Sequence, residues 1–198
     1  MTDWYRRSDW NDKIAADFEA RLARARAPSR AQYLSLQGCA LIAAHADIAE
    51  QLLERWLELG EASELPRAAC YLALARLAQG DVDGSIRAYD RAVEAERANP
   101  AFRSTAAVDQ ALLIGLFNKS DRYWDALDRL AMAGAGPLDL VDFEATAAEA
   151  LIRAGQGDAD TAREKARQAL TLLGDNVADA TWGGVSLAQI RQRLETIA

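Results

Sequence analysis

Residues 70–100 constrain the fold most, because their apolar positions follow the period of two helices joined by a tight turn. Apolar residues recur at i, i+3, i+4 and i+7 in both halves of this segment: Tyr71, Leu74, Ala75 and Ala78 before the turn, and Ile86, Tyr89, Ala92 and Val93 after it. Gly80 follows the first helix, at the position where a residue with positive φ commonly ends a helix. A helical hairpin cannot bury its apolar face alone, so this segment requires neighbours of the same kind.

The chain supplies such neighbours as internal repeats. Residues 151–170 align with residues 74–93 at an offset of 77, so that Gly157-Asp158 repeats Gly80-Asp81. Two more hairpins fit at offsets of about 36 and 41 residues, a spacing typical of helical-repeat proteins. The small residues expected near the helix crossings are Ala49, Ser85, Ala126 and Ala162.

We therefore predict an all-α fold, a solenoid of antiparallel helical hairpins with about ten helices. Alanine supplies 43 of the 198 residues and proline only four, a composition that favours helix, and no segment alternates as a strand would. The predicted helices cover about 11–26, 30–45, 47–59, 64–79, 82–98, 102–117, 121–133, 139–155, 158–173 and 187–197. A single domain, 1–198, would contain an N-terminal lead and helix (1–30), about four hairpins (31–173), and a loop with a C-terminal capping helix (174–198).

These hairpins resemble tetratricopeptide repeats, in which small residues occupy set positions of both helices and a proline follows the second. The residues that carry the resemblance are Ala73, Gly80, Ser85, Tyr89, Ala92 and Pro100. The likeness covers about 31–173, although the Trp-Leu-Gly opening of a strong repeat is absent. The N-terminal pattern also resembles the openings of uncharacterised bacterial proteins of this type, through Trp10, Phe18, Leu22, Arg24-Ala25-Arg26 and Gln32-Tyr33-Leu34. The resemblance implies a tetratricopeptide-like solenoid.

In tetratricopeptide arrays, the first helix of each pair lines a concave groove that binds a partner. The resemblance therefore implies these partner-binding residues: Leu34, Leu41, Arg67, Tyr71, Leu74, Asp109, Gln110 and Glu144. The low charge of 30–45 and 102–117 is compatible with an apolar groove for a partner segment. The alternative is that flanking helices simply bury these two helices.

The sequence offers no recognisable catalytic, cofactor or metal site. His45 is the only histidine and is expected at a helix end, without the companions of a catalytic arrangement. Cys39 and Cys70 have neither zinc-site spacing nor a visible base. The glycine-containing segments lack the spacing and the lysine of nucleotide-binding loops. Acidic residues in the turns are better explained as helix caps than as metal ligands: Asp81, Asp83, Asp158 and Asp160. We predict no enzyme activity, no cofactor and no metal.

The charge of the chain limits the classes of partner that we expect. A net charge of −7 and a pI near 4.8 argue against nucleic acid and are compatible with a basic protein partner. The basic run 21–30 places Arg21, Arg24 and Arg26 among alanines, which is typical of a solvated helix face. No apolar run approaches the ~20 residues of a membrane span, and the N-terminus lacks the apolar region of a secretory signal. We predict a cytoplasmic protein, and an excess of 20 Arg over three Lys is typical of a GC-rich bacterial genome.

Our leading functional hypothesis is a non-enzymatic protein–protein interaction module. It would act as an acidic binder of the immunity or adaptor type that neutralises or escorts a basic protein. One alternative is a structural or assembly role by self-association, through the apolar helices or through Trp4, Trp10 and Trp182 near the chain ends. Another is a small-molecule sensor or an enzyme of unrecognised type, which would need a polar pocket among the groove residues.

Overall fold

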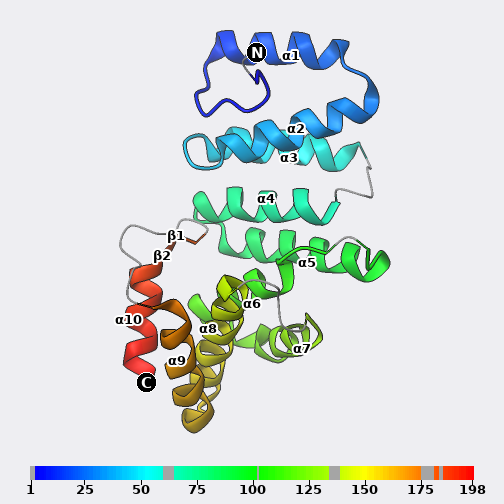
Figure 1. Cartoon of the computed structure of the whole chain (residues 1–198). Coiled ribbons are helices and arrows are strands. Elements are labelled where there is room, and N and C mark those ends of the chain that lie inside the picture. The colour runs from blue at the N-terminus through cyan, green and yellow to red at the C-terminus, as the bar shows by residue number, and fades with distance from the viewer. Residues whose placement is uncertain (1–2, 60–64, 102, 134–138, 175–180, 183–184) are drawn as a thin grey trace. The chain divides into compact units, whose positions relative to one another are not determined.

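The computed structural model describes residues 3–59, 65–101, 103–133, 139–174, 181–182 and 185–198 (Figure 1). Within these residues the protein is almost entirely helical, with ten α-helices, which confirms the predicted all-α class and the predicted number of helices. The chain divides into two compact units, Met1–Ser104 (unit 1) and Thr105–Ala198 (unit 2). None of the described helices combines the length and the apolar character that crossing a bilayer demands.

Unit 1 stacks its described helices in layers that follow the order of the chain (Figure 1). They are α1 (Asp12–Arg24), α2 (Ala27–Leu41), α3 (Ala46–Glu58), α4 (Leu65–Ala78) and α5 (Val82–Ala98). Asn11 caps α1, because its side chain accepts hydrogen bonds at 3.1 Å from the amides of Lys13 and Ile14. Large buried side chains from all five of these helices fill the core: Phe18, Leu41, Leu53, Trp56, Leu72 and Tyr89.

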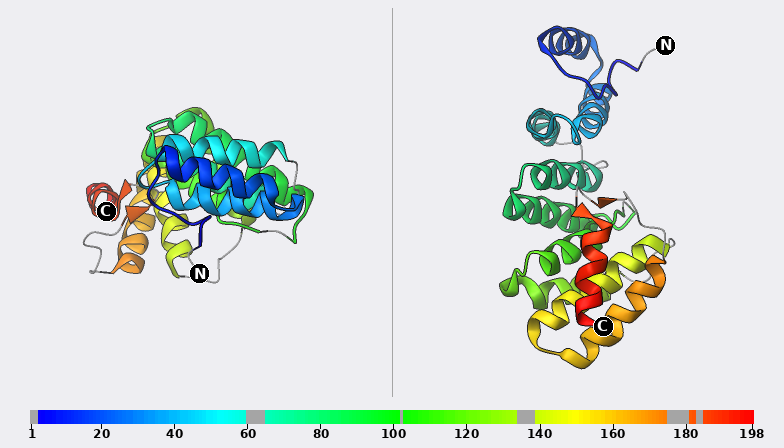
Figure 2. Two further views of the ribbon diagram at one scale, coloured as in Figure 1. Left: turned by 90° about the horizontal axis from the view of Figure 1, so that it is seen from above. Right: turned by 90° about the vertical axis from the view of Figure 1, so that its left-hand side faces the viewer.

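Unit 2 is built from helices and one small ribbon. Its elements are α6 (Ala106–Leu116), the 3-10 turn η2 (Ser120–Arg122), α7 (Tyr123–Ala133), α8 (Asp139–Gln156), α9 (Ala159–Leu173), β1 (Thr181–Trp182), β2 (Val185–Ser186) and α10 (Leu187–Ile197). Helices α8, α9 and α10 lie side by side (Figure 2). Ser186 caps α10 by accepting a hydrogen bond at 3.2 Å from the amide of Ala188. The bounds of α10 match the predicted 187–197.

The turns of hairpins α4–α5 and α8–α9 have the same geometry. Gly80 and Gly157 adopt φ values of +81° and +83°, a region that favours glycine. In both turns the next residue is an aspartate, whose amide donates to the carbonyl five residues earlier at 2.9 Å after Gly80 and 3.0 Å after Gly157. Each aspartate carboxylate also accepts from the amide three residues later. The match at an offset of 77 therefore extends from the sequence to the hydrogen bonds of the turns.

The same offset relates four helices of unit 1 to four of unit 2. A shift of 77 positions carries α2, α3, α4 and α5 onto the ranges of α6, α7, α8 and α9. The small residues predicted near the helix crossings are all buried: Ala49, Ser85, Ala126 and Ala162. Packing differs, however. In unit 1, α3 packs on α4 and α2 meets α4 only lightly, whereas in unit 2, α6 packs on α8 and α7 meets α8 only lightly.

Three local predictions are wrong. The first helix was expected to run to about residue 26 and to be broken by Pro28, but it ends at Arg24. Pro28 lies in the first turn of α2, where a missing amide costs nothing. His45 does not end a helix: α2 ends at Leu41, and His45 is the N-cap residue of α3. Finally, no strand was predicted, but β1 and β2 pair antiparallel with Trp182 opposite Val185. The predicted helix end at Gly60 and the predicted break at 134–137 lie outside the described residues. The organisation of the chain as a single domain, 1–198, stays a prediction.

Candidate functional site

The eight predicted groove residues fall into two groups that differ in exposure. Leu34, Leu41, Asp109, Gln110 and Glu144 are buried. Arg67, Tyr71 and Leu74 are exposed or half-buried, and all three belong to α4. In α6, ten of eleven residues are buried, so unit 2 follows the alternative in which neighbouring helices cover a first helix. Of the eight predicted groove residues, the three on α4 are the ones that remain accessible.

Three accessible residues of α4 form one stripe, which we call the α4 face: Arg67, Tyr71 and Leu74. Their spacing of four and three residues places them on one side of the helix. Tyr71 shares a hydrogen bond with Cys39 of α2, which the sequence analysis did not include in the site. Burial raises the pKa of the Cys39 thiol and of the Tyr71 hydroxyl, while Arg67 favours the ionised form of both. The first helices α2 and α4 therefore meet through a polar contact at the edge of this face.

In unit 2 the structure brings together two predicted residues, Asp109 of α6 and Glu144 of α8. The residues are 9% and 5% exposed. The Thr105 hydroxyl donates to Asp109 at 2.7 Å, and the Trp182 indole of β1 donates to the same carboxyl. None of the described residues donates a hydrogen bond to Glu144, whose carboxyl lies near enough to feel the charge of Asp109. We call these two carboxyls the buried acid pair.

Burial changes the protonation of this pair. Loss of solvent raises the pKa of Asp109 to about 6, and the hydrogen bonds from Thr105 and Trp182 partly oppose the rise. Loss of solvent also raises the pKa of Glu144 to about 7, and the neighbouring Asp109 charge raises it further. The pair therefore holds a proton close to neutral pH.

The surroundings of the pair limit its chemistry. Gln110, next along α6, accepts a hydrogen bond at 2.6 Å from Arg129 of α7, which also pairs with Asp125. In the described part of the chain, no three His, Cys, Asp or Glu side chains gather where they could hold a metal ion. The pair can exchange protons and attract a cation, and the hydroxyl beside it, that of Thr105, donates its proton to the Asp109 carboxyl.

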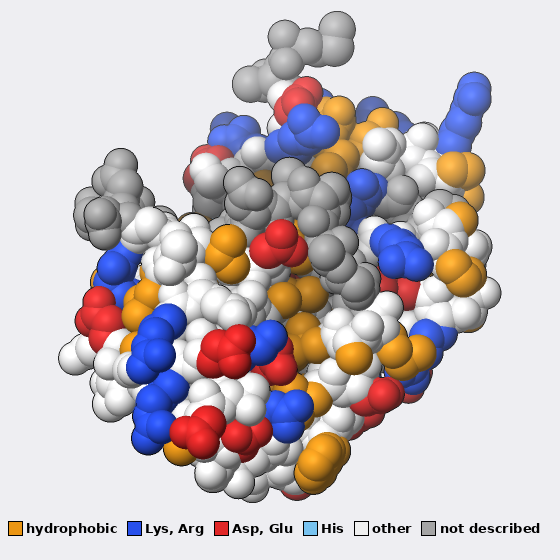
Figure 3. All heavy atoms as spheres, turned by 60° about the horizontal axis from the view of Figure 1, so that its bottom comes forward, with side chains coloured by type: hydrophobic (Ala, Val, Ile, Leu, Met, Phe, Trp, Pro, Cys, Tyr) orange, Lys and Arg blue, Asp and Glu red, His pale blue; other side chains and the backbone are white. Residues whose placement is uncertain are grey.

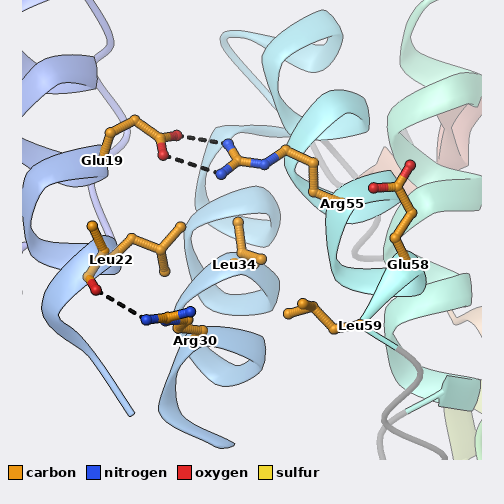
Figure 4. Close-up of a pocket in the computed structure, with 8 residues that line it drawn as sticks. Glu19, Leu22, Arg30, Leu34, Arg55, Glu58 and Leu59 are labelled. Atoms are coloured by element: carbon orange, nitrogen blue, oxygen red, sulfur yellow. Dashed lines mark hydrogen bonds and ion pairs between the residues drawn. The ribbon is translucent and has the colours of Figure 1, made fainter. Parts of the chain in front are cut away.

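A pocket of about 280 Å³ opens between α1, α2 and α3 in unit 1 (Figure 4). Leu22, Leu34 and Leu59 supply its apolar lining. Arg55 spans its rim to reach both carboxylate oxygens of Glu19 at 2.6 and 3.0 Å. Leu34 is the one predicted groove residue that lines this pocket, so it faces α1 and α3 instead of joining the α4 face.

The aromatic residues near the N-terminus pack against the first two helices. Trp4 packs against Phe18 of α1 and Tyr33 of α2, with ring centroids 5.5 and 4.7 Å apart, and Trp10 also packs against Phe18. Gln37 fixes the backbone of Arg7 by accepting from its amide and donating to its carbonyl. Trp4 thus covers the first two helices, and Trp10 covers the first.

Charge is mixed on the surface. On the face turned to the viewer in Figure 3, acidic and basic side chains alternate, with hydrophobic side chains between them. The net charge of −7 is therefore not collected into one acidic patch on that face. Compared with known proteins, the chain matches no family model, no curated protein and no solved structure.

Proposed function

We propose that this chain is a non-enzymatic protein-binding module of tetratricopeptide-like design, in which the stacked hairpins present first helices to a partner. The observation that carries the proposal is the α4 face, where an arginine, a tyrosine and a leucine remain accessible on one side of a first helix. Tyrosine and arginine are enriched where protein partners bind tightly. The matching turns at Gly80 and Gly157 support a repeated hairpin unit.

The partner we propose is a basic protein in the cytoplasm. The net charge of −7 favours association with a positively charged surface and raises the rate of encounter. An immunity or adaptor role, in which the chain neutralises or escorts this partner, accounts for an acidic binder without a recognisable catalytic group. The α4 face would supply the apolar anchor, and the acidic surface would supply the long-range attraction.

Site-specific cross-linking tests this proposal. A photoreactive p-benzoylphenylalanine replaces Tyr71 in the full chain, and a matched variant carries it at Arg87, an exposed position on α5 outside the α4 face. Both variants are produced in the native host and irradiated, and the adducts are identified by mass spectrometry. We expect one stoichiometric adduct with a basic protein at position 71 and none at position 87. No adduct at either position, or the same adducts at both, would contradict the proposal.

A second candidate function, self-association, is favoured by α7. Trp124 and Met132 are 77% and 68% exposed and lie about two turns apart on this helix. Exposed large apolar side chains mark candidate contact surfaces when they are grouped. If α7 joins two copies, light scattering will show a dimer whose population falls with dilution and disappears in a Trp124→Ser variant. A monomer at all concentrations rules this function out.

A further inference from the structure

The pocket between α1, α2 and α3 combines an apolar lining with a charged rim (Figure 4). Leu22 and Leu34 are buried in its lining, whereas Leu59, directly after α3, is 49% exposed. We propose that this pocket binds one apolar side chain of the basic protein partner, of leucine or phenylalanine size, beside a lysine or arginine that pairs with Glu58. The inference rests on the proposed function and names a second contact of that partner, outside the α4 face.

The volume of the pocket suits a side chain better than a whole ligand. Pockets that enclose drug-sized molecules measure about 300–1,000 Å³, and this one measures about 280 Å³. Removing apolar surface such as that of Leu59 from water is favourable, and anchors that fill pockets dominate tight protein interfaces. One partner side chain can therefore fill the pocket and cover Leu59.

The two arginines at the pocket do not make it an anion site. Both terminal nitrogens of Arg55 bind Glu19, at 2.6 and 3.0 Å. Arg30 donates at 2.9 Å to the carbonyls of Ala23 and Ala25, at the C-terminal end of α1 where the helix dipole is negative. An acidic ligand would compete with these contacts, so an apolar occupant fits the pocket better.

Glu58 is the rim charge without a direct partner among the described residues. No hydrogen bond or ion pair reaches it from them, although they include every lysine and arginine of the chain. Arg55 lies near enough to feel the charge of Glu58, but its terminal nitrogens are bound to Glu19. A lysine or arginine beside the inserted side chain would therefore meet an uncompensated negative charge, as expected for a basic partner of a chain with a net charge of −7.

The pocket is a feature of unit 1 and not of the repeated hairpin. At an offset of 77, Leu34 and Arg55 correspond to Ala111 and Met132, so neither the apolar lining nor the rim arginine recurs in unit 2. The hairpin repeat therefore does not require these residues, and a binding role accounts for them.

Methyl NMR of the full chain with labelled leucines tests the inference with three dipeptide probes. N-acetyl-Leu-Lys amide carries both features, N-acetyl-Ser-Lys amide lacks the apolar side chain, and N-acetyl-Leu-Glu amide reverses the charge. We expect the first probe to shift the methyls of Leu22, Leu34 and Leu59 saturably, and the other two to bind at least threefold more weakly. No saturable shift with the first probe, or equal binding of either control probe, overturns the proposal. Shifts of the same methyls on concentrating the protein alone would indicate a second copy of this chain in the pocket and would also overturn it.

Two variants and a matched control locate the binding. Leu59→Ser removes the exposed apolar wall and should weaken binding of the Leu-Lys probe at least threefold. Leu172→Ser changes a similarly exposed leucine of α9, 45% exposed, and should leave binding unchanged. Glu58→Arg should reverse the preference in favour of the Leu-Glu probe, a result that a structural disturbance alone would not produce. Unchanged binding by Leu59→Ser, or an unchanged preference in Glu58→Arg, refutes the site.

The same variants connect the pocket to the partner in the cross-linking experiment. Leu59→Ser and, as its control, Leu172→Ser are each combined with p-benzoylphenylalanine at position 71. We expect the yield of the adduct to be at least threefold lower with Leu59→Ser than with the control. Equal yields would mean that the partner binds the α4 face without this pocket, which refutes the inference and leaves the proposed function intact. Absence of the adduct from both combinations counts against the proposed function, whereas the dipeptide probes report on the pocket alone.

Discussion

In hairpin α4–α5, Arg76 and Gln79 reach back to α3, whereas Arg153 and Gln156, at the same positions 77 residues later in α8–α9, do not reach α7. Arg76 pairs with two glutamates of α3 at 2.8 and 2.7 Å, and Gln79 donates to one of them at 2.7 Å. Arg153 and Gln156 instead bond to each other at 3.4 Å. Among the described atoms, the Arg153 Nε and Gln156 Nε2 are buried without a hydrogen-bond acceptor.

The cause lies on the preceding helix. The glutamates that hold Arg76 are Glu50 and Glu54, and their counterparts at the offset of 77 are Leu127 and Ala131 of α7. Because α7 has no carboxylate at these two positions, it offers no counterpart to the glutamates that hold Arg76. In agreement with this, α3 packs closely on α4, whereas α8 packs on α6. The two hairpins thus share one turn geometry, whereas side chains of the preceding helix determine which helix each hairpin packs against.

This difference in packing also separates the two candidate surfaces. Arg67 of α4 is exposed, but Glu144, its counterpart on α8, is buried because α6 lies against α8. Unit 1 therefore keeps an accessible first-helix face, and unit 2 acquires a buried acid pair. The predictions that follow compare matched positions in the two units.

The largest expected effect concerns the buried acid pair. Because the folded state raises the pKa of Asp109 to about 6 and of Glu144 to about 7, the contribution of this pair to stability is greatest below pH ~4 and is lost as the pH rises through 6 and 7. Glu144→Gln should therefore increase the free energy of unfolding by roughly 3 kcal/mol at pH 8 and change it little at pH 4. Urea denaturation at both pH values measures this.

The counterpart of Glu144 in unit 1 provides the control. Arg67→Gln removes a charge from an exposed position and should leave the pH dependence of unfolding unchanged. If Glu144→Gln is no more stable than the parent at pH 8, the carboxyl is not held at a raised pKa. The interpretation of the acid pair would then be wrong.

The helices could be predicted from the sequence, because capping and apolar period are local. The range predicted for the last helix, 187–197, matches α10, and Gly80 and Gly157 mark the two turns. The acid pair could not be predicted in the same way, although Asp109 and Glu144 were both selected as groove residues. Their burial depends on contact between α6 and α8, which are separated along the chain by α7, and on a donor from the ribbon.

The second prediction compares the two arginines directly. Arg76→Met keeps the apolar stem but removes both ion pairs and the hydrogen bond to the carbonyl of Gly84. Its side chain is largely buried, so the loss should be about 2 kcal/mol, whereas Arg153→Met should cost less than about 0.5 kcal/mol. Denaturant midpoints of the two variants measure the difference. Equal losses would show that the contact with α3 does not distinguish the hairpins.

The third prediction places a residue of α7 in unit 2 at the matching position of α3 in unit 1. Glu50→Leu installs the residue found at position 127, and it removes an acceptor from both Arg76 and Gln79. Since Glu54 still holds Arg76, the cost should be about 1.5 kcal/mol, less than that of removing the arginine. Glu58→Leu, a change of the same kind later on α3, is the matched control and should cost little. Hydrogen exchange should rise at the α3–α4 contact in the first variant only.

The smallest effect tests what the two hairpins share. Gly80→Ala and Gly157→Ala each force an L-residue into a positive φ, and a Cβ at either position meets no atom within 4 Å. The cost is therefore backbone strain alone, about 1 kcal/mol in both variants. Because the turns have the same hydrogen bonds, the two losses should agree within experimental error when measured by denaturation. A much larger loss at Gly80 would mean that the contact of Gln79 with α3 also depends on the turn. The geometry of the turn and the packing of the hairpin would then not be independent.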